Sequence, residues 1–191
     1  MAARADRGWL LAGYWGVAGF FALEVLARQP GSASSLDASR HDGGTTRMVA
    51  SAYVIAAALP PALRRVRALR LPAPAGPAGL ALQAGGLALR AWSMRTLGSS
   101  YTRTLRTDDH QHVVESGPYR LISHPGYTGS LLTWAGFAFT SRSIPVIVLV
   151  AALLGRAYRG RIIAEEELLQ RDLPGYAAYS RHTKRLVPFV W

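Results

Sequence analysis

The sequence predicts an all-α integral membrane protein with about five transmembrane helices, and three observations lead to this prediction. Half of the 191 residues are apolar, whereas only 17% are charged. The apolar residues form blocks long enough to cross a bilayer as helices, which takes about 20 residues and at least about 17. The charged residues lie mostly between these blocks. A chain of this length favours one compact unit, so we expect the helices to pack into a single bundle.

The N-terminal part, residues 1–97, is expected to supply three helices, at about 9–27, 48–63 and 76–94. Glu24 lies inside the first and Arg90 inside the third. A charge inside a membrane span is costly, so the two residues could pair, or Arg90 could extend to the nearby helix end. The first segment could instead be a signal peptide, but Glu24 and the lack of a small-residue cleavage site favour a retained helix.

The C-terminal part, residues 98–191, begins with a polar loop and continues with a long apolar region. That region is interrupted at 140–143, which predicts two helices joined by a tight turn, a hairpin at about 127–158. A polar tail follows the hairpin. Its pattern predicts an amphipathic helical cap that folds back over the loop before the fourth helix.

The formal net charge of +11 is explained more simply by lipid head groups and membrane topology than by nucleic acid, because no nucleic-acid-binding motif accompanies it. With five helices, 14 basic residues fall on the side of the C-terminal tail and 7 on the other side. This balance predicts a cytoplasmic tail and an external N-terminus. Residue usage rich in Arg, Ala and Gly is typical of a bacterial genome, so we expect a multi-pass protein of the bacterial inner membrane with a cytoplasmic site.

Two polar regions carry more chemistry than connectors need. The first spans 99–127, where Pro125 forces His124 out of helical geometry and places it just before a helix N-terminus. His110, His112 and His124 could form a metal site, but no second cluster supports one and none is expected. The chain has no cysteine, which excludes disulfides and thiolate chemistry.

The second polar region spans 156–191. Arg161 and Glu165 are four residues apart and therefore share a face of a helix. We interpret Glu166, Glu167 and Arg171 as a solvated face. Tyr176 and Tyr179 follow in a second short helix. No phosphate-binding loop, nucleophile elbow, zinc-protease motif or dinucleotide fingerprint is present.

These residues occur in the order of a known membrane enzyme family. The elements are Gly117-Pro118-Tyr119, then His124-Pro125-Gly126-Tyr127-Thr128-Gly129, then Arg161-x-x-x-Glu165-Glu166, then Tyr176-x-x-Tyr179, and last Arg185-x-x-Pro188. This arrangement resembles the isoprenylcysteine carboxyl methyltransferase family, which includes phospholipid-methyltransferase relatives. The resemblance covers about residues 98–191. The chain departs from the family at Ser123, where the family has Arg.

The resemblance implies S-adenosylmethionine-dependent methyl transfer to a lipidic or prenylcysteine-like carboxylate at the membrane. It implies a cofactor pocket formed by Gln111, His112, Val113, Val114, Tyr119, His124, Pro125, Gly126, Tyr127 and Glu165. It also implies that Arg161 orients the accepting carboxylate, for which a guanidinium fork is well suited. The expected partners are the bilayer and a lipophilic or lipidated substrate.

Simpler interpretations remain open for several of these residues. Tyr119 and Tyr127 could belong to an interfacial aromatic belt, and Arg161 with Glu165 could be an exposed ion pair of little energetic value. The alternative functions are methylation of a phospholipid amine, a sterol-reductase-like reaction that would bind NADPH, and a non-catalytic membrane scaffold. The sequence does not indicate the methyl acceptor or the oligomeric state.

Overall fold

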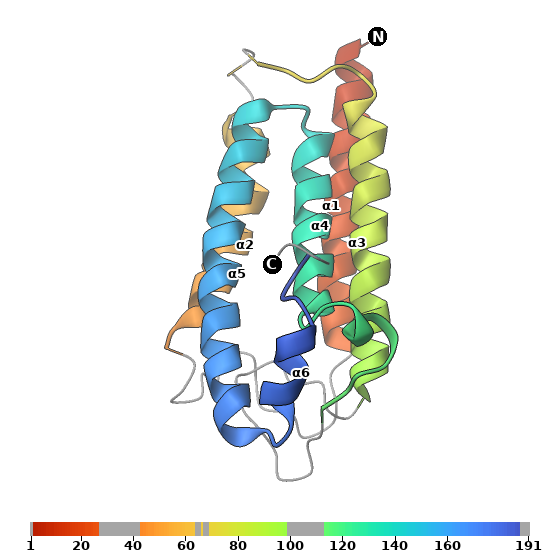
Figure 1. Ribbon diagram of the computed structural model, residues 1–191. Coiled ribbons are helices and arrows are strands. Elements are labelled where there is room, and N and C mark those ends of the chain that lie inside the picture. The colour runs from red at the N-terminus through yellow and green to blue at the C-terminus, as the bar shows by residue number, and fades with distance from the viewer. Residues whose placement is uncertain (1, 27–42, 64–65, 67–68, 99–112, 188–191) are drawn as a thin grey trace.

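A computed structural model describes residues 2–26, 43–63, 66, 69–98 and 113–187. The predictions for Gln111, His112 and His110, and for Pro188, lie outside the described residues. The helices are α1 (Ala2–Leu26), α2 (Thr45–Ala62), α3 (Ala75–Leu97), the 3₁₀ helix η2 (Gly117–Arg120), α4 (Pro125–Thr140), α5 (Ile144–Asp172) and α6 (Tyr176–His182). The helices α1 to α5 run side by side, and the short α6 lies at one end of the bundle (Figure 1).

The part of the chain that the structure describes is helical and contains no strand beyond two isolated bridges, which confirms the predicted helical fold class. Within that part, one segment, Arg7–Leu26 of α1, is long and apolar enough to cross a membrane by length and composition. Helix α4 has only 16 residues and the 18 residues of α2 include two prolines. The count of five transmembrane helices and the division at residue 97 therefore stay predictions.

The hairpin differs from its predicted bounds in one respect. Its turn lies where expected, with Arg142 at a φ of 57° between α4 and α5. The Arg142 guanidinium donates to the carbonyl of Leu71 over 2.8 and 3.0 Å, which ties the turn to the chain before α3. However, α5 continues past 158 to Asp172 without a break. Good helix formers such as Ala164, Glu165 and Leu168 allow the helix to continue beyond its apolar half.

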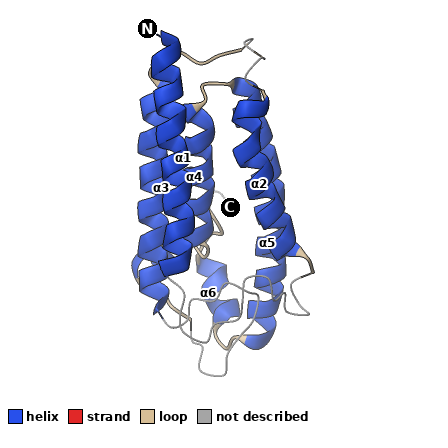
Figure 2. Cartoon of the chain, turned by 180° about the vertical axis from the view of Figure 1, so that it is seen from behind, coloured by secondary structure: helices blue, strands red, loops and turns tan. Residues whose placement is uncertain are grey.

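Helices α3 and α4 approach each other closely because glycines line their interface. A Cβ atom on Gly79 would lie 2.7 Å from the carbonyl oxygen of Gly136, and one on Gly129 would lie 2.7 Å from the amide nitrogen of Arg90. Small residues permit such backbone contact between helices in membranes. Figure 2 shows α1, α3 and α4 as one group, with α2 and α5 as a neighbouring pair.

The two charges predicted inside the spans form a pair in the bundle. Arg90 Nε donates to Glu24 Oε1 over 2.6 Å, which confirms the pairing alternative. Its Nη1 donates to the Gly126 carbonyl over 2.8 Å and to Ser130 Oγ over 2.6 Å. The guanidinium also lies 5.0 Å from the ring centre of Phe20. This single buried side chain therefore connects α1, α3 and the first turns of α4, where the sequence places the cofactor box.

Aromatic side chains fill the space between the two groups of helices. Trp134 of α4 is fully buried and stacks on Tyr53 of α2 with ring centres 4.8 Å apart. Tyr53 shares a hydrogen bond with Tyr158 of α5. Because α2, α4 and α5 meet in this cluster, the polar end of α5 has a defined position relative to the beginning of α4.

Candidate functional site

The beginning of α4 has the geometry that its sequence predicts. Pro125 is the first residue of the helix, and His124 before it has a non-helical φ of −124° and ψ of 55°. His124 is buried, and its ring stacks on that of Tyr127 with centres 5.5 Å apart. Gly117 has a φ of 56°, which starts the turn of η2 that leads the chain into this position.

The C-terminal tail packs against this segment through main-chain hydrogen bonds. The amide of Ser123 donates to the Lys184 carbonyl over 2.6 Å, and that of His124 donates to the Arg185 carbonyl over 3.0 Å. The Ser123 hydroxyl lies 2.8 Å from that of Thr183. Ser123 is buried, so the position where the family has Arg holds a small side chain under the returning tail.

Tyr179 fastens α6 to the same segment. Its hydroxyl donates to the Tyr119 carbonyl over 2.7 Å. Tyr179, the second tyrosine of the Tyr176-x-x-Tyr179 element, therefore helps to hold α6 in place. Burial raises the pKa of Tyr179 to about 12, so the hydroxyl stays protonated as a donor at neutral pH.

Glu166 belongs to the site, and its interpretation as part of a solvated face was wrong. Its side chain is buried, with Oε1 3.3 Å from His124 Nε2 and Oε2 accepting from Arg185 Nε over 2.7 Å. Glu167 is exposed, and the exposed Arg171 pairs with Asp172. The interpretation failed because the partners of Glu166 come from α4 and the tail, which the pattern of α5 alone cannot indicate.

Burial opposes ionisation of Glu166, but the hydrogen bonds and charges of His124 and Arg185 outweigh it, so its pKa is lowered from the ordinary 4.5. A lowered pKa stabilises the fold above the ordinary value, and this stabilisation is lost as the pH falls through the folded-state value. We therefore expect Glu166→Gln to lower the unfolding free energy at neutral pH by about 1–3 kcal/mol. The deficit should shrink as the pH falls below 4.5.

Chemical unfolding of the detergent-purified protein at a series of pH values measures this deficit. Glu167→Gln, which removes a neighbouring exposed carboxylate, is the matched control and should cost little at any pH. A Glu166→Gln deficit that stays the same from pH 7 down to values well below 4.5 would show that the charge of Glu166 is not what stabilises the tail.

A second polar line connects α5, α4 and α2. The Tyr127 hydroxyl donates to Glu165 and accepts from Arg161 Nε over 3.2 Å. Arg161 is buried, and its Nη1 donates to Thr46 Oγ1 over 2.8 Å and to Thr45 Oγ1 over 3.2 Å. Arg161 and Glu165 therefore do not form the exposed ion pair that was considered. They belong to a half-buried arrangement in which the Tyr127 hydroxyl bridges the two. Tyr127 is likewise part of this line and not a surface belt residue.

The Tyr176 hydroxyl is buried and finds no hydrogen-bond partner among the residues that the structure describes. Its ring packs with Leu173, Tyr179, Leu169 and Val113. Burial raises the pKa of the Tyr176 hydroxyl, and the negative charges of Glu166 and Glu165 raise it further. A buried donor without a protein partner is uncommon, and such a hydroxyl is available to a ligand or an ordered water.

The structure thus brings together most of the predicted site residues that it describes. His124 and Tyr127 lie beside the carboxylates of α5, and Val113 packs against the cluster of Leu173, Tyr176 and Tyr179. Gly126 instead directs its carbonyl to Arg90. The carbonyl of Tyr119 accepts a hydrogen bond from the Tyr179 hydroxyl and so helps to hold the tail. Pro125 is the buried first residue of α4, and Val114 is half-buried.

Sequence reasoning missed the contributions of Thr45 and Thr46, because nothing local links the beginning of α2 to α5. Arg185 was noted as part of a motif, but its contact with Glu166 was not foreseen. Among the described residues, no group of three or more His, Cys, Asp and Glu side chains could hold a metal ion.

The fold and the site together define a helical bundle whose buried polar cluster lies where one of its helices begins. The phospholipid methyltransferase family model matches residues 76–174, which is more than half of the chain, and the chain belongs to this membrane-integral family. The predicted resemblance is confirmed by relatives. The probable protein-S-isoprenylcysteine O-methyltransferase of Oryza sativa subsp. indica is 28% identical over 116 residues, which cover 59% of this chain and 60% of that protein.

Protein-S-isoprenylcysteine O-methyltransferase B of Arabidopsis thaliana is 29% identical over 115 residues, covering 59% of this chain and 58% of that protein. Among solved structures, the eukaryotic intramembrane Ras methyltransferase, isoprenylcysteine carboxyl methyltransferase, matches with a TM-score of 0.55 and 23% identity. The match covers 80% of this chain and 55% of that one, and it shows a shared fold. The matched region spans about 60% of the length of the curated relatives.

Proposed function

We propose that this protein is a membrane methyltransferase that uses S-adenosylmethionine to methylate the carboxylate of a lipidic or prenylcysteine-like acceptor. The observation that carries the proposal is the half-buried line of hydrogen bonds from Glu165 through Tyr127 to Arg161. This line lies in a chain of the phospholipid methyltransferase family and next to the box that begins with His124. The proposed class of acceptor is taken from the plant relatives, which are named as isoprenylcysteine O-methyltransferases.

The residues around α4 and α5 fit the methyl donor. S-adenosylmethionine combines a sulfonium cation, an amino-acid group, ribose hydroxyls and an adenine ring, and when bound it supplies an electrophilic methyl group. Glu165 can accept from its ammonium or hydroxyl groups, and the tyrosine rings can pack against the sulfonium or the adenine. The unpartnered Tyr176 hydroxyl offers a further hydrogen bond. The main-chain groups of 111–114 complete the proposed pocket.

Arg161 is proposed to orient the acceptor. Its Nε is held by Tyr127 and its Nη1 by Thr45 and Thr46, so the plane of the guanidinium is set by α4 and α2 together. A carboxylate is already ionised at neutral pH and needs no general base. The contribution of the protein is then placement and exclusion of water, and good placement can lower a barrier by about 7–11 kcal/mol.

The membrane arrangement is part of the proposal. Five spans, with α6 and the following tail as a cap over the donor, would place the site at the cytoplasmic face of a bacterial inner membrane. This is supported by the excess of basic residues on the side of the tail. It is also supported by the main-chain hydrogen bonds that hold the tail against the beginning of α4.

Tyr176 gives the proposal a sharp test. Tyr176→Phe removes a hydroxyl that has no protein partner, so we expect unchanged or slightly higher stability without ligand. If the hydroxyl binds the donor, the affinity for S-adenosylhomocysteine should fall about 5–10-fold, the value of one hydrogen bond. Calorimetry and thermal unfolding of the detergent-purified protein measure the two effects.

Tyr179→Phe is the matched control, because its hydroxyl donates to the Tyr119 carbonyl. It should lower stability. Equal affinities of wild type and Tyr176→Phe for S-adenosylhomocysteine would remove Tyr176 from the site, and a stability loss in Tyr176→Phe as large as in Tyr179→Phe would show that its hydroxyl has a protein partner.

The acceptor class is tested by methyl transfer from radiolabelled S-adenosylmethionine in detergent or liposomes. We expect a base-labile methyl ester with N-acetyl-farnesylcysteine. Because the family model is named for phospholipids, phosphatidylethanolamine is the second acceptor to supply. A base-stable label on phosphatidylethanolamine alone would replace the carboxylate with an amine acceptor, and label on neither would count against catalysis of this kind.

A further inference from the structure

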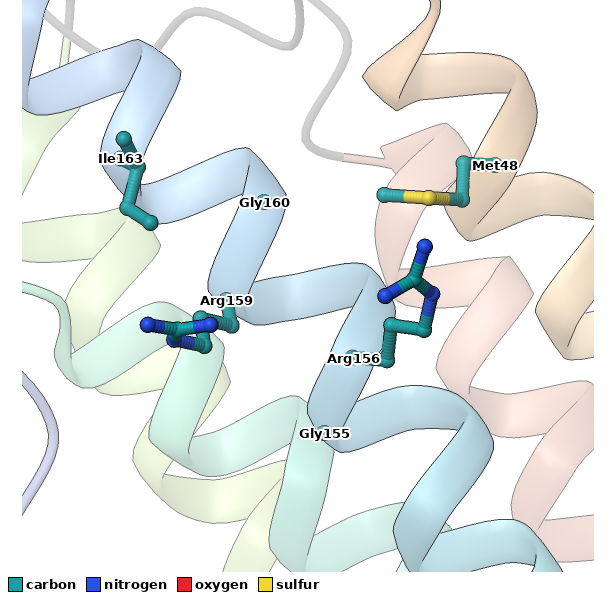
Figure 3. Close-up of a pocket in the computed structure, with 6 residues that line it drawn as sticks. All are labelled: Met48, Gly155, Arg156, Arg159, Gly160 and Ile163. Carbon is teal, nitrogen blue, oxygen red and sulfur yellow. The ribbon is translucent and has the colours of Figure 1, made fainter.

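A cavity of about 370 Å³ lies on the outer side of α5, where this helix faces the beginning of α2 (Figure 3). It is lined by Met48, Gly155, Arg156, Arg159, Gly160 and Ile163. Gly155 leaves its part of the wall open, because a Cβ atom there would meet nothing within 4 Å. At Gly160 the side chain of Met48 lies against α5, since a Cβ atom there would lie 3.0 Å from Met48 Cε.

Two arginines give this cavity a positive charge that no residue described by the structure neutralises. Arg156 and Arg159 are exposed, and neither makes a hydrogen bond or ion pair with any residue that the structure describes. No lining residue is acidic. In Figure 3 the guanidinium of Arg156 reaches toward Met48, and that of Arg159 extends from the neighbouring turn to the other side. The buried Arg90 and Arg161 are by contrast held by protein partners.

The position of the cavity along α5 indicates its depth in the membrane. Residues 144–154 are apolar apart from Pro145, and the cavity begins at the next residue, Gly155. From Arg156 onward the helix carries charges. A helix that changes from apolar to charged at one point places that point near the boundary between hydrocarbon and head groups. The two arginines therefore lie at the level where lipid phosphates are found.

We propose that this cavity binds the head group of one anionic phospholipid, with Arg156 and Arg159 attracting its phosphate and its acyl chains running along α5 toward the apolar residues before Gly155. A guanidinium binds phosphate oxygens with two parallel N–H donors. The glycines give the lipid room against the helix backbone. A free phosphate ion is negatively charged like the head group of the lipid, but the apolar lining of the cavity favours a phosphate that is attached to a hydrocarbon chain. The site is separate from Arg161, which points into the bundle toward Tyr127 and Thr46.

Native mass spectrometry of the full-length protein in detergent tests this proposal and needs no methyl donor, so its result does not depend on the proposed function. The protein is titrated with dioleoylphosphatidylglycerol or with dioleoylphosphatidylcholine. We expect one phosphatidylglycerol to be retained in preference to phosphatidylcholine. With about 1 kcal/mol for each arginine at a membrane surface, R156Q/R159Q should bind phosphatidylglycerol about 30-fold more weakly.

Two further variants separate charge from shape. R95Q/R120Q removes two exposed arginines outside the cavity and should bind like the wild type. Gly155→Leu keeps both cavity arginines but fills the space, and it should also lose the lipid. The proposal is overturned if the two lipids bind equally, if R95Q/R120Q loses as much affinity as R156Q/R159Q, or if Gly155→Leu binds normally. Displacement of the lipid by an equal concentration of inorganic phosphate would likewise overturn it in favour of a phosphate ion.

Discussion

Arg161→Lys is expected to reduce turnover about 100-fold while S-adenosylhomocysteine still binds with nearly normal affinity. Lysine keeps the charge, but it has a single ammonium group in place of the planar fork. It cannot donate at once to Tyr127 and to the pair Thr45 and Thr46, as Arg161 does. The acceptor carboxylate would then be held at the wrong angle, and a displacement of about 1 Å in such a site costs about that factor in rate.

Glu165→Gln is the companion variant for this experiment, because it lies on the other end of the same line of hydrogen bonds. It should weaken S-adenosylhomocysteine binding and leave the shape of the site unchanged. Steady-state kinetics with both substrates varied, together with calorimetry, distinguishes the two variants. If Arg161→Lys and Glu165→Gln lose donor binding and turnover to the same extent, the separate roles proposed for the two residues are wrong.

Glu24→Gln is expected to lower the unfolding free energy of the bundle by about 3–5 kcal/mol. Its carboxylate accepts from Arg90 Nε over 2.6 Å, and the two side chains are only 12% and 9% exposed. Removing one charge leaves the guanidinium buried without its counter-ion, which costs more than the pair itself contributes. Because Arg90 also holds the Gly126 carbonyl, the loss should extend to the beginning of α4.

The control for this variant is Glu115→Gln, whose carboxylate is 58% exposed and lies 3.7 Å from an exposed His182. It should change stability by less than about 0.5 kcal/mol. The double variant Glu24→Gln/Arg90→Met should recover part of the loss, since no buried charge remains. Chemical unfolding in a defined detergent measures all three. A Glu24→Gln protein as stable as Glu115→Gln would show that the pair does not secure the bundle.

The sequence predicts those parts of the fold that depend on local patterns. Hydrophobic blocks indicate the helices, Pro125 places the beginning of α4, and the interruption at 140–143 places the hairpin turn. The pairing of Glu24 with Arg90 was also within reach, because a charge in an apolar span has few alternatives to a partner. The end of α5 could not be predicted in this way, because the apolar pattern does not show how far a helix continues beyond its apolar half.

The parts of the site that escaped prediction depend on contacts between distant segments. Arg161 and Thr46 are 115 residues apart, and Glu166 and His124 are 42 residues apart. A periodic pattern reports which face of α5 is polar, but a buried polar face and a solvated one look alike until their partners are known. Glu166 was misjudged for this reason. The orphan hydroxyl of Tyr176 is likewise visible only once every neighbour has a position.

The measurement that tests the central claim most directly is a structure of the detergent-purified protein with S-adenosylhomocysteine. The ligand should lie between the beginning of α4 and the carboxylate end of α5. It should be within hydrogen-bond distance of Glu165 and the Tyr176 hydroxyl, with the tail of α6 closed over it. A ligand bound elsewhere, or no binding at saturating concentration, would contradict the assignment of this polar cluster as the methyl-donor site.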